Sequence, residues 1–198
     1  MEHMKKINKK RLVIGMSGAS GASLAIQMLE ILRENPDWET HLVISNGAEE
    51  TIIQETEYKP TDVMELADKV YSIRDIGASI ASGTFKTEGM VIVPCSMKTV
   101  AGIACGYSDN LLLRAADVTI KERRNLVLLA RESPLSTIHL RNMLSLSELG
   151  AIIMPPMITY YNKPHDLNDL NRHIIGKVLD RFGIEVNGFN RWGEVSVE

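Results

Sequence analysis

Short apolar runs alternate with segments of helical spacing along most of the chain, and this alternation constrains the fold more than any other feature. Parallel strands need crossovers of about a dozen residues or more, usually helices, which then cover both faces of the sheet. We therefore predict an α/β fold with a doubly wound parallel sheet. The predicted strands are Arg11–Met16, His41–Ser45, Gly89–Val93, Leu126–Ala130 and Ala151–Met154. The predicted helices are Ala22–Arg33, a helix capped by Asn46 that ends near Thr56, Ser96–Ala104, Leu111–Glu122, Ser136–Leu149 and Leu167–Phe182.

The length of the chain fits a single domain. With 198 residues, of which 44% are hydrophobic, it can bury a core of its own. We place the domain at residues 10–185, between a flexible N-terminal tail at 1–9 and a C-terminal tail at 186–198. The less regular stretch at 57–87 is where we expect loops.

Composition and charge argue against several classes of protein. The formal net charge is -3, so no excess of cations attracts the phosphates of nucleic acid. No apolar run approaches the roughly 20 residues of a membrane-spanning helix, and the basic start lacks the apolar core of a signal peptide, so we expect a cytoplasmic protein without a membrane partner. Cys95 and Cys105 lack the spacing of a disulfide framework or a zinc site, and we expect both to be reduced.

A turn rich in glycine and serine, Gly15–Gly21, directly follows the first predicted strand and precedes a helix. Its glycines let the backbone approach an anion, and the positive end of the helix dipole favours phosphate, although a tight turn without a ligand is the alternative. The second strand ends in Ser45 and Asn46 rather than in the acid that binds a nicotinamide ribose, and the turn lacks both the G-x-G-x-x-G and the G-x-S-x-G motif. The pattern favours a mononucleotide, with Ser45 within reach of it.

Polar residues follow other predicted strands, at the edge of the sheet where ligands of this fold class bind. Ser96 to Thr99 suit ligand contacts, although Ser96 could equally be only a helix cap. Arg131 and Glu132 follow the next strand, where an arginine can tune a carboxylate as an acid or base; a salt bridge that caps a helix is the alternative. Tyr161 follows the last strand and could bind phosphate or lie in a contact between subunits.

The sequence contains no recognisable metal site. His139, His165 and His173 lack the spacing of metal ligands, so we expect them to be structural. No acidic cluster of the DDxxD type is present to hold magnesium on a diphosphate. Any phosphate chemistry would therefore depend on protein cations.

Eight features, in order, span nearly the whole chain from Arg11 to Phe182. They are GMSGASG, Ser45, ASGT at 81–84, PCSMKT, RAADVTIKERR, LLARESP, IHLRNM and TYYNKP. Together they resemble the UbiX-type flavin prenyltransferases, a family whose members include proteins long named as a component of phenolic acid decarboxylase. The resemblance implies a flavodoxin-like Rossmann sandwich that assembles as a dodecamer.

The resemblance also implies a reaction. A dimethylallyl group from dimethylallyl phosphate would be joined to N5 and C6 of reduced FMN without a metal, and the prenylated FMN would pass to a UbiD-type decarboxylase of aromatic or phenolic acids. The lack of magnesium ligands favours the monophosphate over the diphosphate as donor. The residues that would hold FMN are Gly18, Ala19, Ser20, Ser45, Ser96, Met97, Lys98, Thr99 and Arg131.

The remaining roles concern the prenyl donor and proton transfer. Dimethylallyl phosphate would be bound by Tyr161 and Lys177, with Arg114 and Lys121 as cations contributed by a neighbouring copy of the chain in the assembly. Positive charge in a dry pocket would help the anionic leaving group to depart. The catalytic residues would be Glu132 for proton transfer, Ser20 as a relay, Glu55 positioned from the second helix, and Lys121.

Two residues depart from the family pattern. Lys177 stands where many relatives have arginine, which keeps the charge but loses the forked geometry of a guanidinium, and we expect activity to survive. Ile76 stands near the position of a tryptophan in some relatives, so π stabilisation of a cationic intermediate is lost there and the rate or the donor preference could shift.

Two other functions stay open at this point. An FMN-dependent cysteine decarboxylase would share the fold, but its active-site histidine and PxMNxxMW-type motif are not visible, and MPPMITYY stands where the motif would fall. A non-catalytic FMN carrier would have no use for Glu132, Lys121, Tyr161 and Lys177 together.

Overall fold

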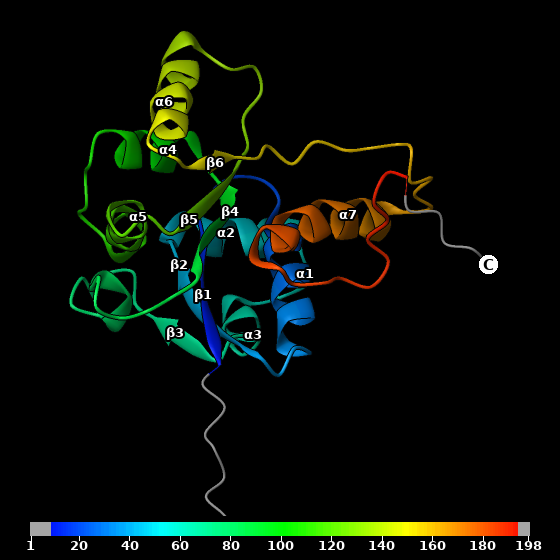
Figure 1. The fold of residues 1–198 in the computed structure, drawn as a ribbon, viewed down its shortest axis with the longest axis horizontal. Coiled ribbons are helices and arrows are strands. Elements are labelled where there is room, and N and C mark those ends of the chain that lie inside the picture. Colours follow the sequence, from blue (N-terminus) through cyan, green and yellow to red (C-terminus); the bar gives the residue numbers. More distant parts are fainter. Residues whose placement is uncertain (1–8, 194–198) are drawn as a thin grey trace, which may run out of the picture.

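The computed structural model describes residues 9–193, which form one six-stranded sheet with helices on both faces (Figure 1). The strands are β1 (Lys10–Met16), β2 (Trp38–Ile44), β3 (Lys69–Tyr71), β4 (Gly89–Cys95), β5 (Asn125–Ala130) and β6 (Ile152–Ile153). The helices are α1 (Ala22–Arg33), α2 (Asn46–Glu55), α3 (Pro60–Met64), α4 (Met97–Ala104), α5 (Leu111–Lys121), α6 (Thr137–Glu148) and α7 (Leu167–Leu179), with short 3-10 helices η1 (Ser79–Ala81) and η2 (Asp180–Phe182). Residues 1–8 and 194–198, which belong to the two predicted tails, lie outside the described residues. None of the described helices is long and apolar enough to cross a membrane.

All neighbouring strands are parallel, in the order β3-β2-β1-β4-β5-β6. This is the strand order of a Rossmann sheet, and without the short edge strand β3 it is the order of a flavodoxin sheet. The predicted doubly wound α/β fold is therefore confirmed. Strand addition changes direction between β1 and β4, so the carboxyl ends of these two strands flank the crevice where ligands of this fold class bind.

Alternate residues of each central strand pack into two separate cores. Along β1, Leu12 and Ile14 face the core built with α1, α2, α3 and α7, whereas Val13 faces the core built with α4, α5 and α6. A strand buried on both faces needs apolar residues at every position, which explains the continuous apolar runs in the sequence. Full burial of one leucine or isoleucine contributes about 1.5–3 kcal/mol, so the two cores hold the strand ends firmly in place.

The stretch at 57–87 contains more regular structure than the loops predicted there. It includes α3, β3 and η1. Lys69 and Val70 of β3 are exposed because the strand lies at the edge of the sheet, where it pairs only with β2. An exposed edge strand carries no continuous apolar run, so no pattern in the sequence indicates it.

The other predicted elements correspond closely to the structure, and the cap of α2 is the main correction. Ser45, and not Asn46, is the N-cap: its Oγ accepts a hydrogen bond from the Ala48 amide at 3.2 Å, and Asn46 is the first helical residue. The last predicted helix divides into α7 and η2, after which Gly183 adopts a left-handed conformation with φ of 70°. That conformation favours glycine, so the helical segment ends where the sequence predicted.

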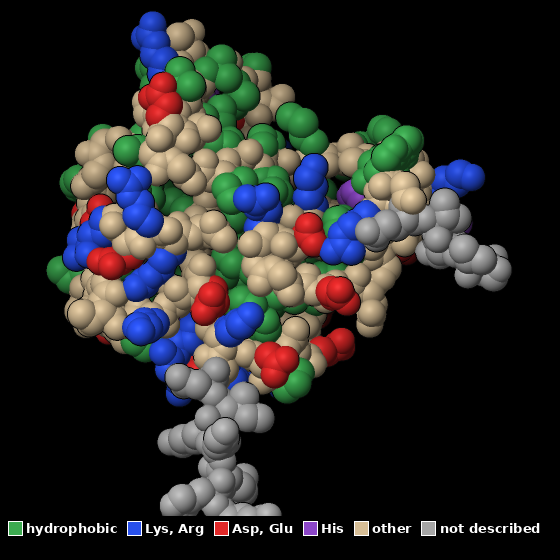
Figure 2. All heavy atoms as spheres, viewed as in Figure 1, with side chains coloured by type: hydrophobic (Ala, Val, Ile, Leu, Met, Phe, Trp, Pro, Cys, Tyr) green, Lys and Arg blue, Asp and Glu red, His purple; other side chains and the backbone are tan. Residues whose placement is uncertain are grey.

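α6 projects from the rest of the molecule (Figure 1). Of its residues only Met143 and Leu146 are buried, whereas Ile138, Leu140 and Leu144 are 67%, 52% and 61% exposed. Figure 2 shows hydrophobic side chains at the surface of this projection. An uncovered apolar helix face of this kind indicates an interaction surface.

The residues after η2 pack back onto α7. Val186 belongs to the core beneath α7, and the ring of Phe189 packs against that core. Gly176 makes this contact possible, because a Cβ at this position would lie 2.5 Å from Cγ of Phe189. The packed part of the chain therefore reaches at least Phe189, which lies within the predicted C-terminal tail.

Candidate functional site

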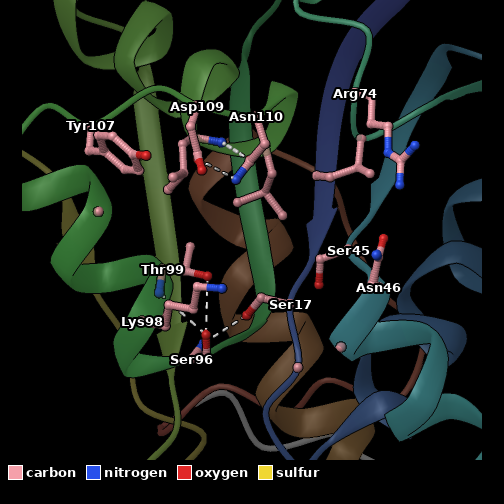
Figure 3. Close-up of a pocket in the computed structure, with 16 residues that line it drawn as sticks. Ser17, Ser45, Asn46, Arg74, Ser96, Lys98, Thr99, Tyr107, Asp109 and Asn110 are labelled. Atoms are coloured by element: carbon pink, nitrogen blue, oxygen red, sulfur yellow. Dashed lines mark hydrogen bonds between the residues drawn. The ribbon is translucent and has the colours of Figure 1, made fainter.

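Ser17 joins the ends of β1 and β4 at the point where the sheet changes direction (Figure 3). It is 3% exposed, its hydroxyl donates to the Pro94 carbonyl oxygen at 2.9 Å, and its hydroxyl oxygen accepts from the Ser96 amide at 2.7 Å. The Ser17 amide also donates to the Pro94 carbonyl, at 3.2 Å. These bonds fix the spacing of the residues that follow the two strands.

A pocket of about 460 Å³ lies at these strand ends, a volume typical of small-molecule sites. Three helices begin at it: Ser45 caps α2, Ser96 caps α4 and Asn110 caps α5, each through a side-chain oxygen that accepts from a first-turn amide. Helix N-termini carry partial positive charge, Lys98 and Arg74 add two full positive charges, and Asp109 adds one negative charge, so the lining is positive on balance. The apolar part of the pocket lining includes Ile73, Leu112 and Leu113. The pocket can therefore hold a ligand with an anionic group and an apolar part.

Two hydroxyl groups at the starts of α2 and α4 keep protons that a ligand can use, one on Ser45 and one on either Ser96 or Thr99. Ser45 accepts from the Ala48 amide, so its own O–H is free to donate. Ser96 accepts from the Thr99 amide at 3.3 Å, and the Ser96 and Thr99 hydroxyl oxygens are 3.1 Å apart, so one of these two hydroxyls donates to the other. Figure 3 shows Ser45 across the pocket from Lys98 and Thr99, an arrangement that can enclose an anion from two sides.

Two glycines bring the turn after β1 close to the start of α2. A Cβ on Gly18 would lie 2.9 Å from the backbone Cα and carbonyl carbon of Gly47, and both residues line the pocket. A Cβ on Gly47 would be less crowded, at 3.3 Å from Gly18 Cα. This close backbone contact lines this part of the pocket with peptide groups rather than side chains.

The structure brings most of the residues predicted to hold FMN to this pocket. Those that line it are Gly18, Ser45, Ser96, Lys98 and Thr99. Met97 differs from them because its side chain is buried in the core, so only its backbone is left to contact a ligand. Ala19, Ser20 and Arg131 do not line this pocket; Ser20 and Arg131 instead interact with Glu55, through a hydrogen bond and through charge, respectively.

Glu55, at the end of α2, caps the N-terminus of α1. Its Oε2 accepts from the Gly21 amide at 2.8 Å and from the Ala22 amide at 2.9 Å. Burial raises the pKa of the Glu55 carboxyl, but hydrogen bonds from the Ser20 hydroxyl and from these two amides, with the charge of Arg131, outweigh burial and hold the pKa below its usual range. The Gly21 and Ala22 amides are therefore occupied by a carboxylate, which corrects the expectation that free amides at this helix start bind phosphate.

The depressed pKa of Glu55 makes its contribution to stability depend on pH. We expect Glu55→Gln to lower the unfolding free energy by about 1 kcal/mol at pH 7, because charge-assisted bonds to a helix N-terminus are lost. The carboxylate stabilises the fold above its unfolded-state pKa near 4.5, and this stabilisation is lost as the pH falls through the lower pKa of the folded state.

Urea unfolding of wild type and Glu55→Gln between pH 7 and pH 3 checks this expectation. Glu50→Gln, on the exposed face of the same helix, is the control and should match wild type. The difference in unfolding free energy between wild type and Glu55→Gln should shrink as the pH falls. A difference that stays constant or grows would contradict the expected role of the Glu55 carboxylate.

Arg131 and Glu132 lie in the loop after β5, at the same edge of the sheet. The Arg131 amide donates to the Cys95 carbonyl oxygen at 2.9 Å, which ties the loop to the end of β4. The Glu132 side chain is exposed, and its Oε1 accepts from the Ser133 amide at 3.0 Å. The structure thus presents this carboxylate at the edge that carries the pocket.

Tyr161 lines a second, smaller pocket of about 250 Å³ with residues of the C-terminal segment, Asn190 to Gly193. Its hydroxyl oxygen is 3.1 Å from Nε2 of His173 on α7, and its ring meets Trp192 edge to face with centroids 5.1 Å apart. Lys177 follows one turn after His173 on α7 and is exposed. Tyr161 and Lys177 are both predicted to bind the prenyl donor. Their phenol and ammonium groups are carried by two segments that are in contact, the loop that contains Tyr161 and helix α7.

Lys121 lies apart from the other predicted site residues within one chain, whereas Arg114 directly follows Leu113, which lines the first pocket. Both are on α5, where Arg114 pairs with Asp117 at 2.6 Å and Lys121 pairs with Glu122 at 2.5 Å. α5 starts at the first pocket, and its 11 residues carry the chain roughly 16 Å away from it. Lys121 therefore lies near the start of β5, at the opposite edge of the sheet.

Some residues of the site had no individual signal in the sequence. Ser17 and Gly47 act through contacts between segments that are distant in the chain, and Asn110 caps a helix that the sequence predicts without showing that it begins at the pocket. His173 was expected to be only structural, yet its imidazole contacts Tyr161. Within residues 9–193, no group of three or more histidine, cysteine or acidic side chains is placed to hold a metal ion.

The first pocket fits a flavin mononucleotide. Hydroxyl donors and helix N-termini suit its phosphate, the apolar lining suits its ring, and the glycine contact leaves room for the ligand to meet the backbone. The residues that follow β2, Ser45 and Asn46, offer no carboxylate to bind the second ribose of a dinucleotide.

Comparisons with known proteins agree with this assignment. The profile of the Flavoprotein family matches residues 1–179. A probable UbiX-like flavin prenyltransferase from Sedimentibacter hydroxybenzoicus is 54% identical over 182 residues, which cover 92% of this chain and 96% of that protein. The similarity therefore extends over nearly the full length of both proteins.

Two solved structures are similar over nearly the whole chain. One is a dodecameric FMN-dependent UbiX-like decarboxylase from Escherichia coli O157:H7, with a TM-score of 0.90 and 51% identity, covering 93% of this chain and all of that one. The other is AnUbiX (PadA1) in complex with FMN and dimethylallyl pyrophosphate, with a TM-score of 0.92 and 48% identity, covering 95% of this chain and all of that one. By contrast, the peptidyl-cysteine decarboxylase EpiD shares the fold alone, at 18% identity and a TM-score of 0.58. The chain belongs to the Flavoprotein family and, within it, to the UbiX-like flavin prenyltransferases.

Proposed function

We propose that the protein transfers a dimethylallyl group from dimethylallyl phosphate to reduced FMN. The observation that carries this proposal is the pocket at the ends of β1 and β4, where three capped helix N-termini surround a flavin-sized space, in a chain 54% identical to a flavin prenyltransferase. When bound, reduced FMN supplies the nucleophilic N5 and C6 positions that receive the prenyl group.

The flavin phosphate would be held by hydroxyls and amides rather than by a metal. Ser45 and one of the paired hydroxyls of Ser96 and Thr99 offer hydroxyl donors, and Lys98 adds a charge at the pocket wall. Gly18 would contribute a backbone amide from the turn after β1. The Ala19 amide already donates to the Ser17 carbonyl oxygen at 2.8 Å, so Ala19 would contact the flavin by packing rather than through that amide. Arg131, whose amide is hydrogen-bonded to Cys95 at the end of β4, would also contact the flavin.

The prenyl donor would be bound by its phosphate. Tyr161 and Lys177 supply a phenol and an ammonium from one chain. Arg114 and Lys121 would come from another copy, because within one chain α5 carries Lys121 away from the pocket. Cations around the phosphate would stabilise the negative charge that develops as it leaves the allylic carbon.

Proton transfer would depend on the acids at the sheet edge. Glu132 would supply the proton that the prenyl alkene takes up before ring closure and would accept the proton that C6 releases when the new bond forms, since its carboxylate is exposed at the edge that carries the site. Ser20 donates its hydroxyl hydrogen bond to Glu55, so Glu55 would orient the Ser20 relay. This division gives Glu132 the chemical role and Glu55 a positioning role.

Assembly into a homo-oligomer would complete the site. The uncovered apolar face of α6 needs a partner, and the similar Escherichia coli protein is described as dodecameric. We propose a dodecamer of the same kind. A monomer by light scattering at micromolar concentration would remove the basis for sharing Arg114 and Lys121 between copies.

The product would serve another enzyme. We propose that prenylated FMN passes to a UbiD-type decarboxylase of aromatic or phenolic acids, and that both proteins are cytoplasmic. Copurification of prenylated FMN with a coexpressed decarboxylase only when this chain is present would support the transfer.

Anaerobic incubation of the purified protein with reduced FMN and dimethylallyl phosphate tests the function. Mass spectrometry of the released flavin should show a gain of one C5 prenyl unit, with release of inorganic phosphate. Dimethylallyl diphosphate in a parallel reaction determines which donor is used. Unmodified FMN from demonstrably flavin-bound protein would instead support a carrier or a cysteine-oxidising flavoprotein.

A further inference from the structure

His173 is a buried histidine in direct contact with a residue of the proposed donor site. Its side chain is 4% exposed, and its Nε2 lies 3.1 Å from the hydroxyl oxygen of Tyr161. The two rings meet edge to face, with centroids 5.4 Å apart. At this distance one of the two groups donates a hydrogen bond to the other, and the imidazole tautomer decides which one.

The second nitrogen of the ring identifies the tautomer. Nδ1 of His173 is buried and has no hydrogen-bond partner among residues 9–193. The ring of Phe189 packs against the imidazole with the ring planes tilted by 47° and the centroids 5.2 Å apart, and Gly176 allows this approach because a side chain there would collide with Phe189. A proton on Nδ1 would therefore be a buried donor without an acceptor, which native structures avoid more strictly than an unpaired acceptor.

The imidazole is also neutral at neutral pH. Burial lowers the pKa of His173, and the positive charge of Lys177, one turn further along α7, lowers it as well. A neutral ring carries one proton, and the unpartnered Nδ1 leaves Nε2 as its site. Nε2 then donates to Tyr161.

We propose that His173 is a positioning residue that donates its Nε2 proton to the Tyr161 oxygen and so turns the Tyr161 hydroxyl proton outward, toward the phosphate of the prenyl donor. The inference rests on the proposed function, because it assigns the outward hydroxyl to a phosphate. His173 and Lys177 lie four residues apart on one face of α7, so the Tyr161 hydroxyl and the Lys177 ammonium are presented from the same side. A hydrogen bond received by the phenol oxygen also strengthens its own O–H as a donor.

The opposite tautomer has the opposite consequence. If Nδ1 carried the proton, Nε2 would accept from Tyr161 and the phenol would have no proton left for a phosphate oxygen. Tyr161 would then repel the phosphate through its lone pairs rather than bind it. The position of a single proton therefore separates a donor-binding tyrosine from a structural one.

Nitrogen NMR of protein labelled with ¹⁵N-histidine measures this proton directly. We expect His173, assigned by the signal lost in His173→Phe, to show a protonated Nε2 and an unprotonated Nδ1 at pH 7.5. Solid-state spectra of sedimented protein keep the measurement possible for a large oligomer. A protonated Nδ1 with an unprotonated Nε2 would overturn the proposal, whatever the activity of the protein.

Steady-state kinetics separate positioning from a merely structural role. His173→Phe keeps a ring of similar size but removes the donor, and we expect the KM for dimethylallyl phosphate to rise about tenfold while the affinity for FMN stays within about twofold. His173→Gln, whose side-chain amide can reach the place of Nε2, should recover most of this loss. An unchanged KM in His173→Phe, or no recovery in His173→Gln when both variants bind FMN normally, would contradict the inference.

A double substitution provides the remaining control. In a Tyr161→Phe background, where the hydroxyl is absent, His173→Phe should cause no further rise in KM. Additive effects would mean that His173 acts independently of Tyr161 and would overturn the proposal. If the wild-type protein transfers no prenyl group at all, the proposed function is wrong. If the wild-type protein transfers the group normally and His173→Phe has an unchanged KM for dimethylallyl phosphate, only the inference about His173 is wrong.

Discussion

Replacing Glu132 with glutamine is expected to slow prenyl transfer by about 100-fold or more while leaving FMN bound, because general acid and base catalysis contributes about 10²–10⁴-fold. Glutamine is the informative choice. The Glu132 Oε1 accepts from the Ser133 amide, and the amide oxygen of glutamine can accept the same hydrogen bond, so the loop after β5 should keep its conformation. Only the ability to exchange a proton is removed.

Single-turnover experiments measure the effect on the chemical step. Protein loaded with reduced FMN is mixed anaerobically with dimethylallyl phosphate, and quenched samples are analysed by mass spectrometry for prenylated flavin. Glu34→Gln, an exposed acid that follows the last residue of α1, removes the same charge away from the pocket and should react like wild type. Full turnover in Glu132→Gln with FMN bound would show that proton transfer depends on another group.

The fold could be predicted because its main strands are buried on both faces. The residues of β1 pack alternately into two cores, so every position is apolar and the run is visible without a structure. β3 shows the limit of this reasoning. It is a three-residue edge strand with exposed Lys69 and Val70, so nothing in its composition distinguishes it from a loop.

The site could be predicted to the extent that it depends on strand ends. Ser45, Ser96 and Arg131 each follow a parallel strand directly, and such ends meet at one edge of the sheet in any doubly wound fold. No comparable rule predicts the side-chain contacts between helices and loops that are distant in the sequence. The capping of α1 by Glu55 and the contact between His173 and Tyr161 depend on how helices pack, which spacing in the sequence does not reveal.

The position of Lys121 illustrates a further limit. Its motif resembles a catalytic element, yet α5 carries it to the edge of the sheet opposite the pocket, where it pairs with Glu122. The family resemblance implies that a neighbouring copy of the chain contributes Lys121, whereas the spacing of residues in the sequence gives no physical reason for that assignment. Lys121 is too far from the pocket of its own chain to bind a donor phosphate there. Its proposed role therefore requires a site that is shared between two copies of the chain.

Gly18→Ala is expected to weaken FMN binding by about 10–100-fold, because forcing a methyl group into a packed contact costs about 1–3 kcal/mol. A Cβ on Gly18 would lie 2.9 Å from backbone atoms of Gly47, and backbone cannot rotate away as a side chain can. The turn after β1 and the start of α2 would have to separate. Both segments line the pocket, so the amides and the Ser45 hydroxyl would lose their common geometry.

Two further glycines make this a graded test of the contact. Gly47→Ala places its methyl 3.3 Å from Gly18 Cα, a contact that a shift of a few tenths of an ångström relieves, so the loss of affinity should be only a few-fold. Gly77→Ala, whose Cβ meets only Asp75 Oδ1 at 3.6 Å, should bind FMN like wild type. Fluorescence titration of FMN gives the three dissociation constants, with urea unfolding as a check on the fold. The predicted order of affinity loss follows only from the distance between the added Cβ and the nearest backbone atoms. Equal losses of FMN affinity in Gly18→Ala and Gly47→Ala would mean that the close approach of the turn after β1 to the start of α2 does not shape the flavin site.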